Sequence, residues 1–523
     1  MTEASIVAGA RPRIDRRPGR LVACAAGGAL LLLALQTLAA SRLELSFDEA
    51  YYTLWSRDLA FGYLDHPPMV AVLIRASTAL FGDSDLGIRA LSLALVGALP
   101  GLVALIAWRL FGSLDTAALA VLMWIAAPLV IAGAVFVTPD APLVLFWMLG
   151  LAALVELWRT GRARWIIAMG LALGLMLMSK FTAAFFAAGA ALAVVATPSL
   201  RRWLRSPLPW LALALAAAVF SPFVAWNAAH GWATFLKQGG RAAAAGFTPF
   251  YLVEFALSQI LLINPLVFAA LAAAIAGVSW RKSVAPGSPE EARRLLVATI
   301  APAAVYFLVH AAHDRVQGNW LAPLFPACAI LAGEWVARAR RAAGAAGRVA
   351  RAALWAAPLA LAVMLAGFVQ ALTGVLPLGA ADPTARLEGF RELARDVDAR
   401  ARAEGAPYVL TQGYALASLL TVYGDPGLAV VQPEQRIRWI FAPSPPESLF
   451  DRRGLAIAEA GRRYDLVLGM RFRSVEPAGT IERRRAGRVL QAYELFRVAE
   501  PYAPVLDPPC PSAEVDLART CRR

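Results

Sequence analysis

Residues 46–68 read SFDEAYYTLWSRDLAFGYLDHPP, a polar and aromatic window that comes shortly after the apolar run 21–40. The window crowds several ionisable side chains together, namely Asp48, Glu49, Asp58, Asp65 and His66. It ends in a Pro-Pro pair, which restricts the backbone. Adjacent carboxylates beside a long apolar segment, interleaved with aromatic rings, indicate a site rather than a spacer.

The composition of the chain is that of a membrane protein. Of its 523 residues, 59% are hydrophobic and only 16% are charged, which is too apolar for an ordinary soluble protein. The net charge of +14 would also suit nucleic acid. However, the basic residues lie between apolar runs, where Lys and Arg usually mark cytoplasmic loops. No basic stripe lies on a soluble domain, which argues against a nucleic-acid partner.

Apolar runs long enough to cross a bilayer recur over residues 21–374. A crossing helix needs roughly 20 apolar residues, and we expect about eleven such helices here. The expected spans are 21–40, 87–111, 116–136, 140–158, 164–179, 181–197, 208–226, 251–279, 295–312, 319–337 and 352–374. The first run has no clear small-residue cleavage site after it, so we expect an uncleaved first helix. Membrane lipids therefore surround most of the chain.

Arginine and lysine predict the orientation in the membrane. If the basic segment 1–20 is cytoplasmic, every second connection is rich in arginine, as in 159–164, 201–205 and 338–351. The remaining connections are acidic or mixed, beginning with the first loop, 41–86. The alternation holds at every crossing. An odd number of crossings then places residues 375–523 on the outer side, which is the periplasm if the protein lies in a bacterial inner membrane.

We expect the tail, residues 375–523, to form a separate α/β domain. It is long enough to bury a hydrophobic core of its own. We expect strands at 408–411, 428–432, 465–468 and 489–496, and amphipathic helices at 385–403 and 447–461. Cys510 and Cys521 lie in this tail and would form a disulfide in an oxidising compartment. Cys24 and Cys328 lie in apolar segments, where cysteine behaves as a small hydrophobic residue.

Candidate functional residues collect on the predicted outer face. They are Asp48 and Glu49 in the first loop, Asp140 at the start of the fourth span, Lys180 between two spans, and Lys237, Arg241, His313, Arg315 and Asn319 in later outer connections. An ionisable side chain near membrane depth usually faces a cavity or a partner. Carboxylates beside cations suit a substrate with a lipid-linked phosphate and an acceptor that needs a base.

Each candidate also has a simpler structural explanation. Asp48 or Glu49 would stabilise the N-terminus of a juxtamembrane helix by capping it. For Asp140, which follows Thr138 and Pro139 at a helix start, the capping role is the favoured one. Lys180 would extend from a helix end towards water. It is the convergence of acids and cations on one face that favours a site.

Five segments carry a family resemblance. They are FDEAYYTLWSRDLAFGYLDHPP (47–68), FGDSDLGIRALS (81–92), TPDAPLVLFWML (138–149), LGLMLMSKFTA (173–183) and RVQGNWLAPLFPACAIL (315–331). Their order and spacing over 40–335 resemble bacterial glycosyltransferase family 39, the dolichyl-phosphate-mannose–protein mannosyltransferase-like family. That family includes the 4-amino-4-deoxy-L-arabinose lipid A transferase. The tail carries much less of the resemblance.

The resemblance implies an all-α polytopic membrane protein of the GT-C type, in which residues 21–374 form the transmembrane domain and 375–523 a periplasmic domain. Such an enzyme transfers a sugar from a polyprenyl-phosphate donor to an acceptor on the periplasmic face, with inversion. The acceptor would be lipid A, another glycolipid, a polysaccharide or a protein. The sugar, the acceptor and the oligomeric state cannot be derived from the sequence.

Site residues follow from the same resemblance. Asp48 matches the first-loop aspartate that acts as base or orients the acceptor, Glu49 is its companion, and Asp140 matches the second-loop acid. Candidate contacts to the donor phosphate or the acceptor on this basis are His66, Arg75, Lys180 and Arg315. Lys237, Arg241 and Asn319 are added because they lie in outer connections. No cofactor is required. Family members vary in metal use, and Asp48, Asp140 and His66 offer oxygen and imidazole ligands for a divalent ion.

Three other functions compete with this prediction. A transporter or lipid-linked-sugar flippase usually shows internal repeats and charges near the midplane, whereas this sequence has no repeat and its polar residues lie at the outer ends of the spans. A ligase for whole oligosaccharides would instead favour a basic, histidine-containing loop over an acidic one. A non-catalytic scaffold does not need the clustered acids.

Overall fold

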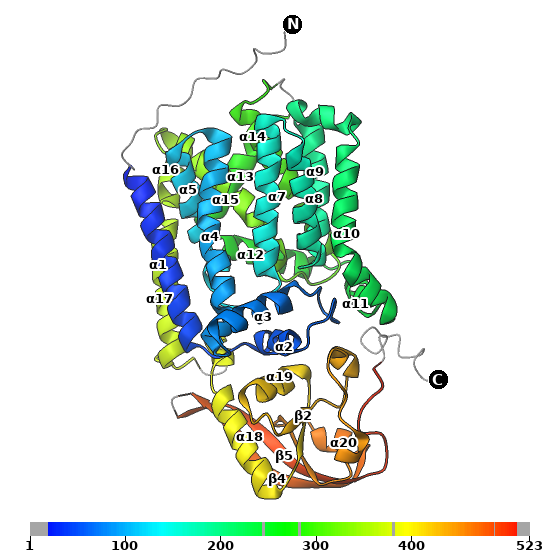
Figure 1. Cartoon of the computed structure of the whole chain (residues 1–523). Helices are drawn as coiled ribbons and strands as arrows, with labels where there is room; N and C mark the ends of the chain where they lie inside the picture. The colour runs from blue at the N-terminus through cyan, green and yellow to red at the C-terminus, as the bar shows by residue number, and fades with distance from the viewer. Residues whose placement is uncertain (1–18, 243–245, 281–283, 379–381, 486, 510–523) are drawn as a thin grey trace.

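The computed structural model describes residues 19–242, 246–280, 284–378, 382–485 and 487–509, although not the side chains of residues 241, 242 and 383. A tall bundle of helices stands on a small mixed domain (Figure 1). The bundle comprises residues 19–378 and the C-terminal domain residues 382–509. The predicted fold class, a mostly helical membrane protein with a small C-terminal α/β domain, is confirmed.

The helices of the bundle follow one another with short connections. They are α1 (Arg20–Arg42), α2 (Phe47–Arg57), α3 (Met69–Phe81), α4 (Asp85–Phe111), α5 (Leu114–Ile125), α6 (Pro128–Gly133), α7 (Asp140–Thr160), α8 (Arg164–Leu177), η1 (Phe181–Ala183), α9 (Ala184–Ala196), η2 (Pro198–Arg205), α10 (Leu208–Ala229), α11 (Ala233–Ala242), α12 (Pro249–Ile263), α13 (Pro265–Ala276), α14 (Pro289–His310), η3 (Gly318–Leu324), α15 (Phe325–Ala339), α16 (Gly344–Ala353) and α17 (Ala356–Thr373).

Within the described residues, seven helices are long and apolar enough to cross a membrane, or up to nine if each bent pair is one span. The protein is therefore a multi-pass membrane protein. The expected count of about eleven spans is not confirmed and stays a prediction. Two of the expected spans, 116–136 and 164–179, overlap the shorter apolar helices α5 and α8.

The expected span 251–279 is broken in the middle. Helices α12 and α13 meet at an angle of 104°, and Asn264 between them has a φ of 84°. Pro265 lacks the N–H that would continue the helix. The Asn264 side chain instead accepts a hydrogen bond from Leu266 N at 3.0 Å and donates one to Ala126 O at 3.2 Å. Sequence hydropathy does not register this break because both halves are apolar.

Small residues let the central helices approach closely. Nearly every residue of α15 is buried, and a Cβ placed on Gly333 would collide with the backbone of Ala120 in α5. Close backbone contact at small residues is a common way for membrane helices to pack. This contact joins two helices at the centre of the main apolar core.

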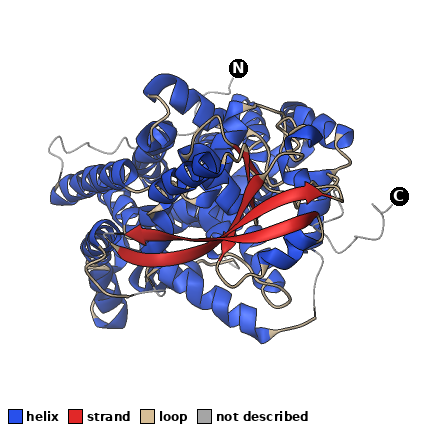
Figure 2. Ribbon diagram, turned by 90° about the horizontal axis from the view of Figure 1, so that it is seen from below, coloured by secondary structure: helices blue, strands red, loops and turns tan. Residues whose placement is uncertain are grey.

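The C-terminal domain contains a five-stranded mixed sheet (Figure 2). Its elements are η5 (Pro383–Leu387), α18 (Phe390–Glu404), β1 (Tyr408–Thr411), α19 (Tyr414–Tyr423), β2 (Ala429–Val431), η6 (Arg436–Trp439), η7 (Glu447–Leu449), β3 (Gly454–Glu459), α20 (Tyr464–Gly469), β4 (Phe472–Arg485) and β5 (Arg488–Pro501). The strand order is β2-β1-β3-β5-β4. Strand β1 is parallel to both of its neighbours, and β5 is antiparallel to β3 and β4.

Two of the expected elements in this domain are wrong. The expected strand 465–468 lies in helix α20, and the expected helix 447–461 contains only the turn η7 before strand β3 begins. Strand β3 is buried along most of its length, and a short, evenly apolar segment cannot be assigned to helix or strand by periodicity. The strands expected at 408–411, 428–432 and 489–496 are present as β1, β2 and β5. Cys510 and Cys521 lie outside the described residues.

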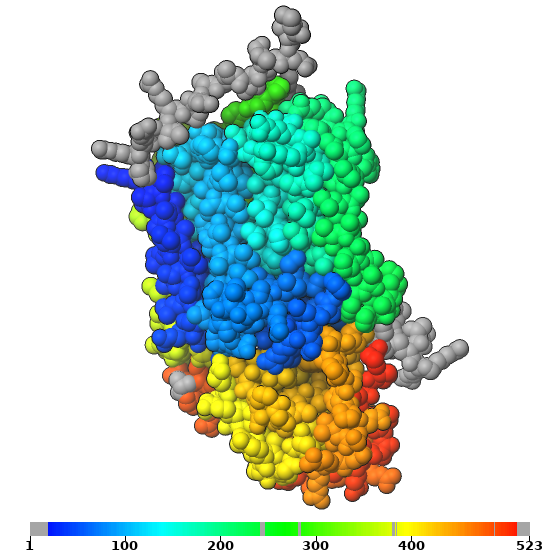
Figure 3. Space-filling model, in the orientation of Figure 1, coloured from blue at the N-terminus to red at the C-terminus, as the bar shows by residue number. Residues whose placement is uncertain are grey.

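Helices α2 and α3 form the layer between the bundle and the C-terminal domain (Figures 1 and 3). Tyr51 and Trp55 of α2 belong to an apolar cluster that also contains Leu419 of α19, with Tyr414 and Phe441 packed against it. Most of the first-loop window, residues 46–68, is therefore buried, although residues 57–59 and Phe61 are exposed.

Candidate functional site

The start of α2 is fixed by Glu49. Ser46 N donates to Glu49 Oε2 at 2.9 Å, and Glu49 N donates to Ser46 Oγ at 3.3 Å, which is a capping box. The capping explanation weighed for Glu49 is thus realised. Glu49 and Arg89 of α4 are both fully buried, and they pair through distances of 2.7 Å (Nε–Oε1) and 2.8 Å (Nη2–Oε2).

Arg89 also ties down the end of α1. It donates to Ala40 O at 2.9 Å, Leu43 O at 2.7 Å and Glu44 O at 2.9 Å. Val137 N donates to Glu49 Oε1 at 3.0 Å. Both oxygens of Glu49 are thus occupied and enclosed, so its carboxylate holds α1, α2 and α4 together. The geometry makes Glu49 a positioning residue for the neighbouring Asp48.

Asp48 lies in a different environment from its neighbour. Its Oδ1 accepts a hydrogen bond from Tyr414 Oη at 3.2 Å, and the side chain is only partly exposed. Burial raises the pKa of Asp48 to about 6, although the Tyr414 hydrogen bond opposes this shift. A carboxylate with a pKa near the working pH is well matched to general-base catalysis.

Asp65 forms a second centre with two cations. Lys237 Nζ lies 2.5 Å from Asp65 Oδ1, and Arg438 Nη1 lies 2.9 Å from Oδ2. Burial alone would raise the pKa of Asp65, but the charges of Lys237 and Arg438 outweigh it and lower the pKa. Gln238 also donates to the Asp65 carbonyl at 2.8 Å. Lys237 was among the predicted site residues, whereas Asp65 and Arg438 were not.

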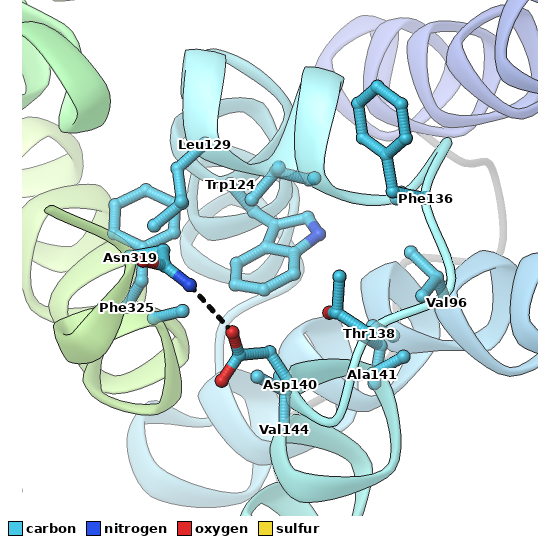
Figure 4. A pocket seen from close by; sticks show the side chains of 15 residues that line it. Val96, Trp124, Leu129, Phe136, Thr138, Asp140, Ala141, Val144, Asn319 and Phe325 are labelled. Carbon is cyan, nitrogen blue, oxygen red and sulfur yellow. Dashed lines mark hydrogen bonds between the residues drawn. The ribbon is translucent and has the colours of Figure 1, made fainter. Parts of the chain in front are cut away.

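Asp140, Lys180 and Asn319 meet in a third centre, of which Figure 4 shows the Asp140–Asn319 hydrogen bond. Lys180 Nζ lies 2.6 Å from Asp140 Oδ1, and Asn319 Nδ2 donates to Asp140 Oδ2 at 2.8 Å. Asp140 is the first residue of α7, yet the cap position is Pro139 and no side chain caps this helix. The expectation that the Asp140 carboxylate caps this helix is therefore wrong.

Two cavities adjoin this third centre. Asp140 and Asn319 line a cavity of about 260 Å³ whose other walls are mainly apolar (Figure 4). Lys180 lines another, of about 220 Å³, together with His66, Gln238 and His310 and several aromatic side chains. The Asp140–Lys180 pair thus connects an apolar cavity with a polar, aromatic one.

The side chain of Tyr52 is influenced by the carboxylates of Asp48, Asp65 and Asp140. Burial raises the pKa of its hydroxyl far above the usual range, and the charges of Asp48, Asp65 and Asp140 add to that shift. Its ring also lies 6.2 Å from the ring of His66. All three carboxylates therefore lie within electrostatic range of this side chain of α2.

Other predicted residues lie apart from these centres. Arg75 is exposed on α3, and Arg315 is mostly exposed and pairs with Glu254 at 2.5 Å. Neither lines either cavity. Arg241 lies outside the residues whose side chains the structure describes. Among the described residues, no group of three His, Cys, Asp or Glu side chains is arranged to hold a metal ion, so the suggested Asp48, Asp140 and His66 set gains no support.

Comparisons with known proteins agree with this architecture. Residues 65–226 match the family model described as dolichyl-phosphate-mannose-protein mannosyltransferase. Lipid A galacturonosyltransferase RgtD of Rhizobium johnstonii is 28% identical over 287 residues, which is 54% of this chain and 59% of RgtD. The match therefore spans little more than half of either protein.

Solved structures match over nearly the whole chain. ArnT from Cupriavidus metallidurans bound to undecaprenyl phosphate aligns with a TM-score of 0.61 at 14% identity, over 93% of this chain and 99% of ArnT. The chain has the GT-C fold of ArnT. Its apo state aligns with a TM-score of 0.56 at 16% identity, over 93% of this chain and 100% of ArnT. The resemblance stated from the sequence is confirmed.

Proposed function

We propose that this protein is a membrane glycosyltransferase that moves a sugar from a polyprenyl-phosphate donor to a lipid acceptor. The observation that carries the proposal is the grouping of Asp48 and Asp140 at one end of the bundle, with the Asp140–Lys180 pair between two cavities. The fold shared with ArnT, which has been solved bound to undecaprenyl phosphate, and the relative named as a lipid A transferase support it. They do not favour a flippase.

The cavity beside Lys180 suits the phosphate of the donor. Lys180, His66, His310 and Gln238 supply hydrogen-bond donors to it, and charge-assisted hydrogen bonds are the strong contacts for a phosphate oxygen. The aromatic walls offer a surface for the first isoprene units or the sugar ring. The apolar cavity beside Asp140 and Asn319 then remains for lipid chains.

The reaction is a single displacement with inversion. The acceptor hydroxyl or amine attacks C1 of the sugar, the bond between C1 and the phosphate oxygen breaks, and Asp48 takes the acceptor proton. Lys180 stabilises the negative charge that develops on the departing polyprenyl phosphate. Because Lys180 is already held by Asp140, this cation is fixed before the substrate arrives. We place the reaction on the periplasmic side of a bacterial inner membrane.

Asp48→Asn tests the proposal because it keeps the shape of the side chain and removes the base. We expect purified wild-type protein to transfer label from one member of a panel of polyprenyl-phosphate sugars. Asp48→Asn should lower kcat by about 10²–10⁴-fold and leave donor binding intact. Asp58→Asn, at an exposed position at the end of the same helix, is the matched control and should remain active. Labelled lipid that crossed vesicle membranes without any sugar transfer, in wild type and mutant alike, would instead indicate a transporter.

A further inference from the structure

Two carboxylates of the first loop are each held by the C-terminal domain. Tyr414, the first residue of α19, donates its hydroxyl hydrogen to Asp48. Arg438 in the turn η6 pairs with Asp65. These contacts join residues that are 366 and 373 positions apart in the chain.

We infer that Tyr414 and Arg438 are positioning residues, through which the C-terminal domain completes the site by holding Asp48 and Asp65 in place. That Tyr414 and Arg438 affect catalysis rests on the proposed transferase activity. That they hold Asp48 and Asp65 in place does not. Neither residue reaches the Asp140–Lys180 pair through a described contact.

Arg438 is fixed on several sides, as a positioning residue must be. Its guanidinium lies 4.4 Å from the centre of the Tyr414 ring, a cation–π contact. Its Nη1 contacts both oxygens of Asp65, at 2.9 and 3.2 Å. Its backbone carbonyl accepts a hydrogen bond from Tyr51 Oη at 2.9 Å. One side chain therefore links the ring that bonds Asp48 to the carboxylate of Asp65.

The groups that face Asp48 determine what loss of Tyr414 would do. Tyr414 and Arg438 favour the ionised carboxylate, while Asp65 and Glu49 disfavour it, and Tyr52 lies within range of its charge. Removing only the Tyr414 hydroxyl deletes one favourable contact and keeps the others. The pKa of Asp48 should rise further, so less of the base would be ionised at a given acidic pH.

A second set of contacts docks the same domain without reaching Asp48 or Asp65. Arg391 pairs with Asp85 at 2.7 Å, and Tyr423 Oη accepts from Leu45 N at 2.6 Å while donating to Asp85 at 3.2 Å. Glu44 accepts from Phe390 N at 2.7 Å. Tyr423 lies on α19, the same helix as Tyr414. Tyr423→Phe is therefore a matched control that removes one hydroxyl from the same interface.

The experiment compares full-length wild type with Tyr414→Phe, Arg438→Gln and Tyr423→Phe. Two pH profiles are recorded: kcat/KM for transfer, and the rate at which dicyclohexylcarbodiimide modifies Asp48, located by peptide mass spectrometry with Asp48→Asn as blank. The reagent attacks protonated carboxyl groups, so this second profile needs no turnover. We expect Tyr414→Phe to move both profiles to higher pH by about one unit, and to lower kcat/KM about tenfold on the acidic side.

Arg438→Gln should shift the profiles in the same direction, because it removes a cation that favours the ionised form, and Tyr423→Phe should leave them at wild-type values. The inference is overturned if Tyr414→Phe keeps both wild-type profiles, or if Tyr423→Phe shifts them equally. Failure of wild type to transfer any sugar would count against the proposed function alone. The carbodiimide profile would then still decide whether Tyr414 acts on Asp48.

Discussion

Replacement of Arg89 by methionine should be among the most damaging single changes near the site. Arg89 and Glu49 are both fully buried. In Arg89→Met, Glu49 keeps the hydrogen bonds from Ser46 N and Val137 N but loses its only described cationic partner. Three backbone carbonyls at the end of α1 lose their donor as well. The variant thus leaves a carboxylate buried without a compensating charge.

The expected loss follows from that uncompensated charge. Removing one partner of a buried ion pair typically costs about 3–5 kcal/mol in the free energy of unfolding. The double variant Glu49→Leu/Arg89→Met removes both charges, and replacement of a buried pair by apolar side chains is often close to neutral. It should therefore be more stable than Arg89→Met alone, a non-additivity expected for residues in direct contact.

Unfolding by sodium dodecyl sulfate in mixed micelles measures these free energies. Arg338→Gln is the control, because Arg338 is about half exposed and its partner Glu334 keeps a second arginine, Arg293, at 3.1 Å. Glu334 is buried, but it keeps Arg293 in this variant and the lost partner is half exposed, so we expect a cost of about 0–1 kcal/mol. If Arg89→Met were no more destabilising than Arg338→Gln, or if the double variant were less stable than Arg89→Met, the role assigned to the buried pair would be wrong.

Two further predictions concern stability. Because the pKa of Asp65 is lowered in the folded protein, its ionised form stabilises the fold above the ordinary Asp pKa of about 3.9 and loses that contribution as the pH falls through the folded-state pKa. The stability difference between wild type and Asp65→Asn in pH-dependent unfolding should thus be larger at neutral pH than in acid. Gly333→Ala should destabilise by about 1–3 kcal/mol through overpacking against Ala120. By contrast, Gly101→Ala, with open space around it in α4, should be neutral or stabilising in thermal unfolding, since alanine favours helices.

The sequence predicted which residues belong to the site better than it predicted which of them contact one another. Asp140, Lys180 and Asn319 were all named as candidates, each from a different outer connection. Their convergence on one carboxylate depends on how α7, α8 and η3 pack, which local pattern does not determine. Glu49 could be read as an acid of the site or as a cap. Only the structure, in which buried Arg89 pairs with Glu49, shows that both carboxylate oxygens of Glu49 already have hydrogen-bond partners. The catalytic and binding roles remain predictions.

Long-range partners account for most of what the sequence did not predict. Nothing near Tyr414 or Arg438 marks them as neighbours of the first loop, because the tail carries little family resemblance and those contacts cross most of the chain. In the same way, strand β3 follows from tertiary packing. The break at Asn264 has a local cause in Pro265, but the apolar residues on both sides of it hide it from hydropathy. By contrast, a long apolar run is a local feature, so the long spans could be located from the sequence.

The separation between Asp48 and Tyr414 has a consequence for biosynthesis. A nascent chain that has just completed α17 already contains every helix of the bundle, together with Asp48, Asp140 and Lys180, but not yet Tyr414 or Arg438. The first-loop carboxylates acquire their last partners only after the sheet domain has been translated, delivered to the same side of the membrane and folded. Assembly of the complete site is therefore one of the final events in the maturation of this protein.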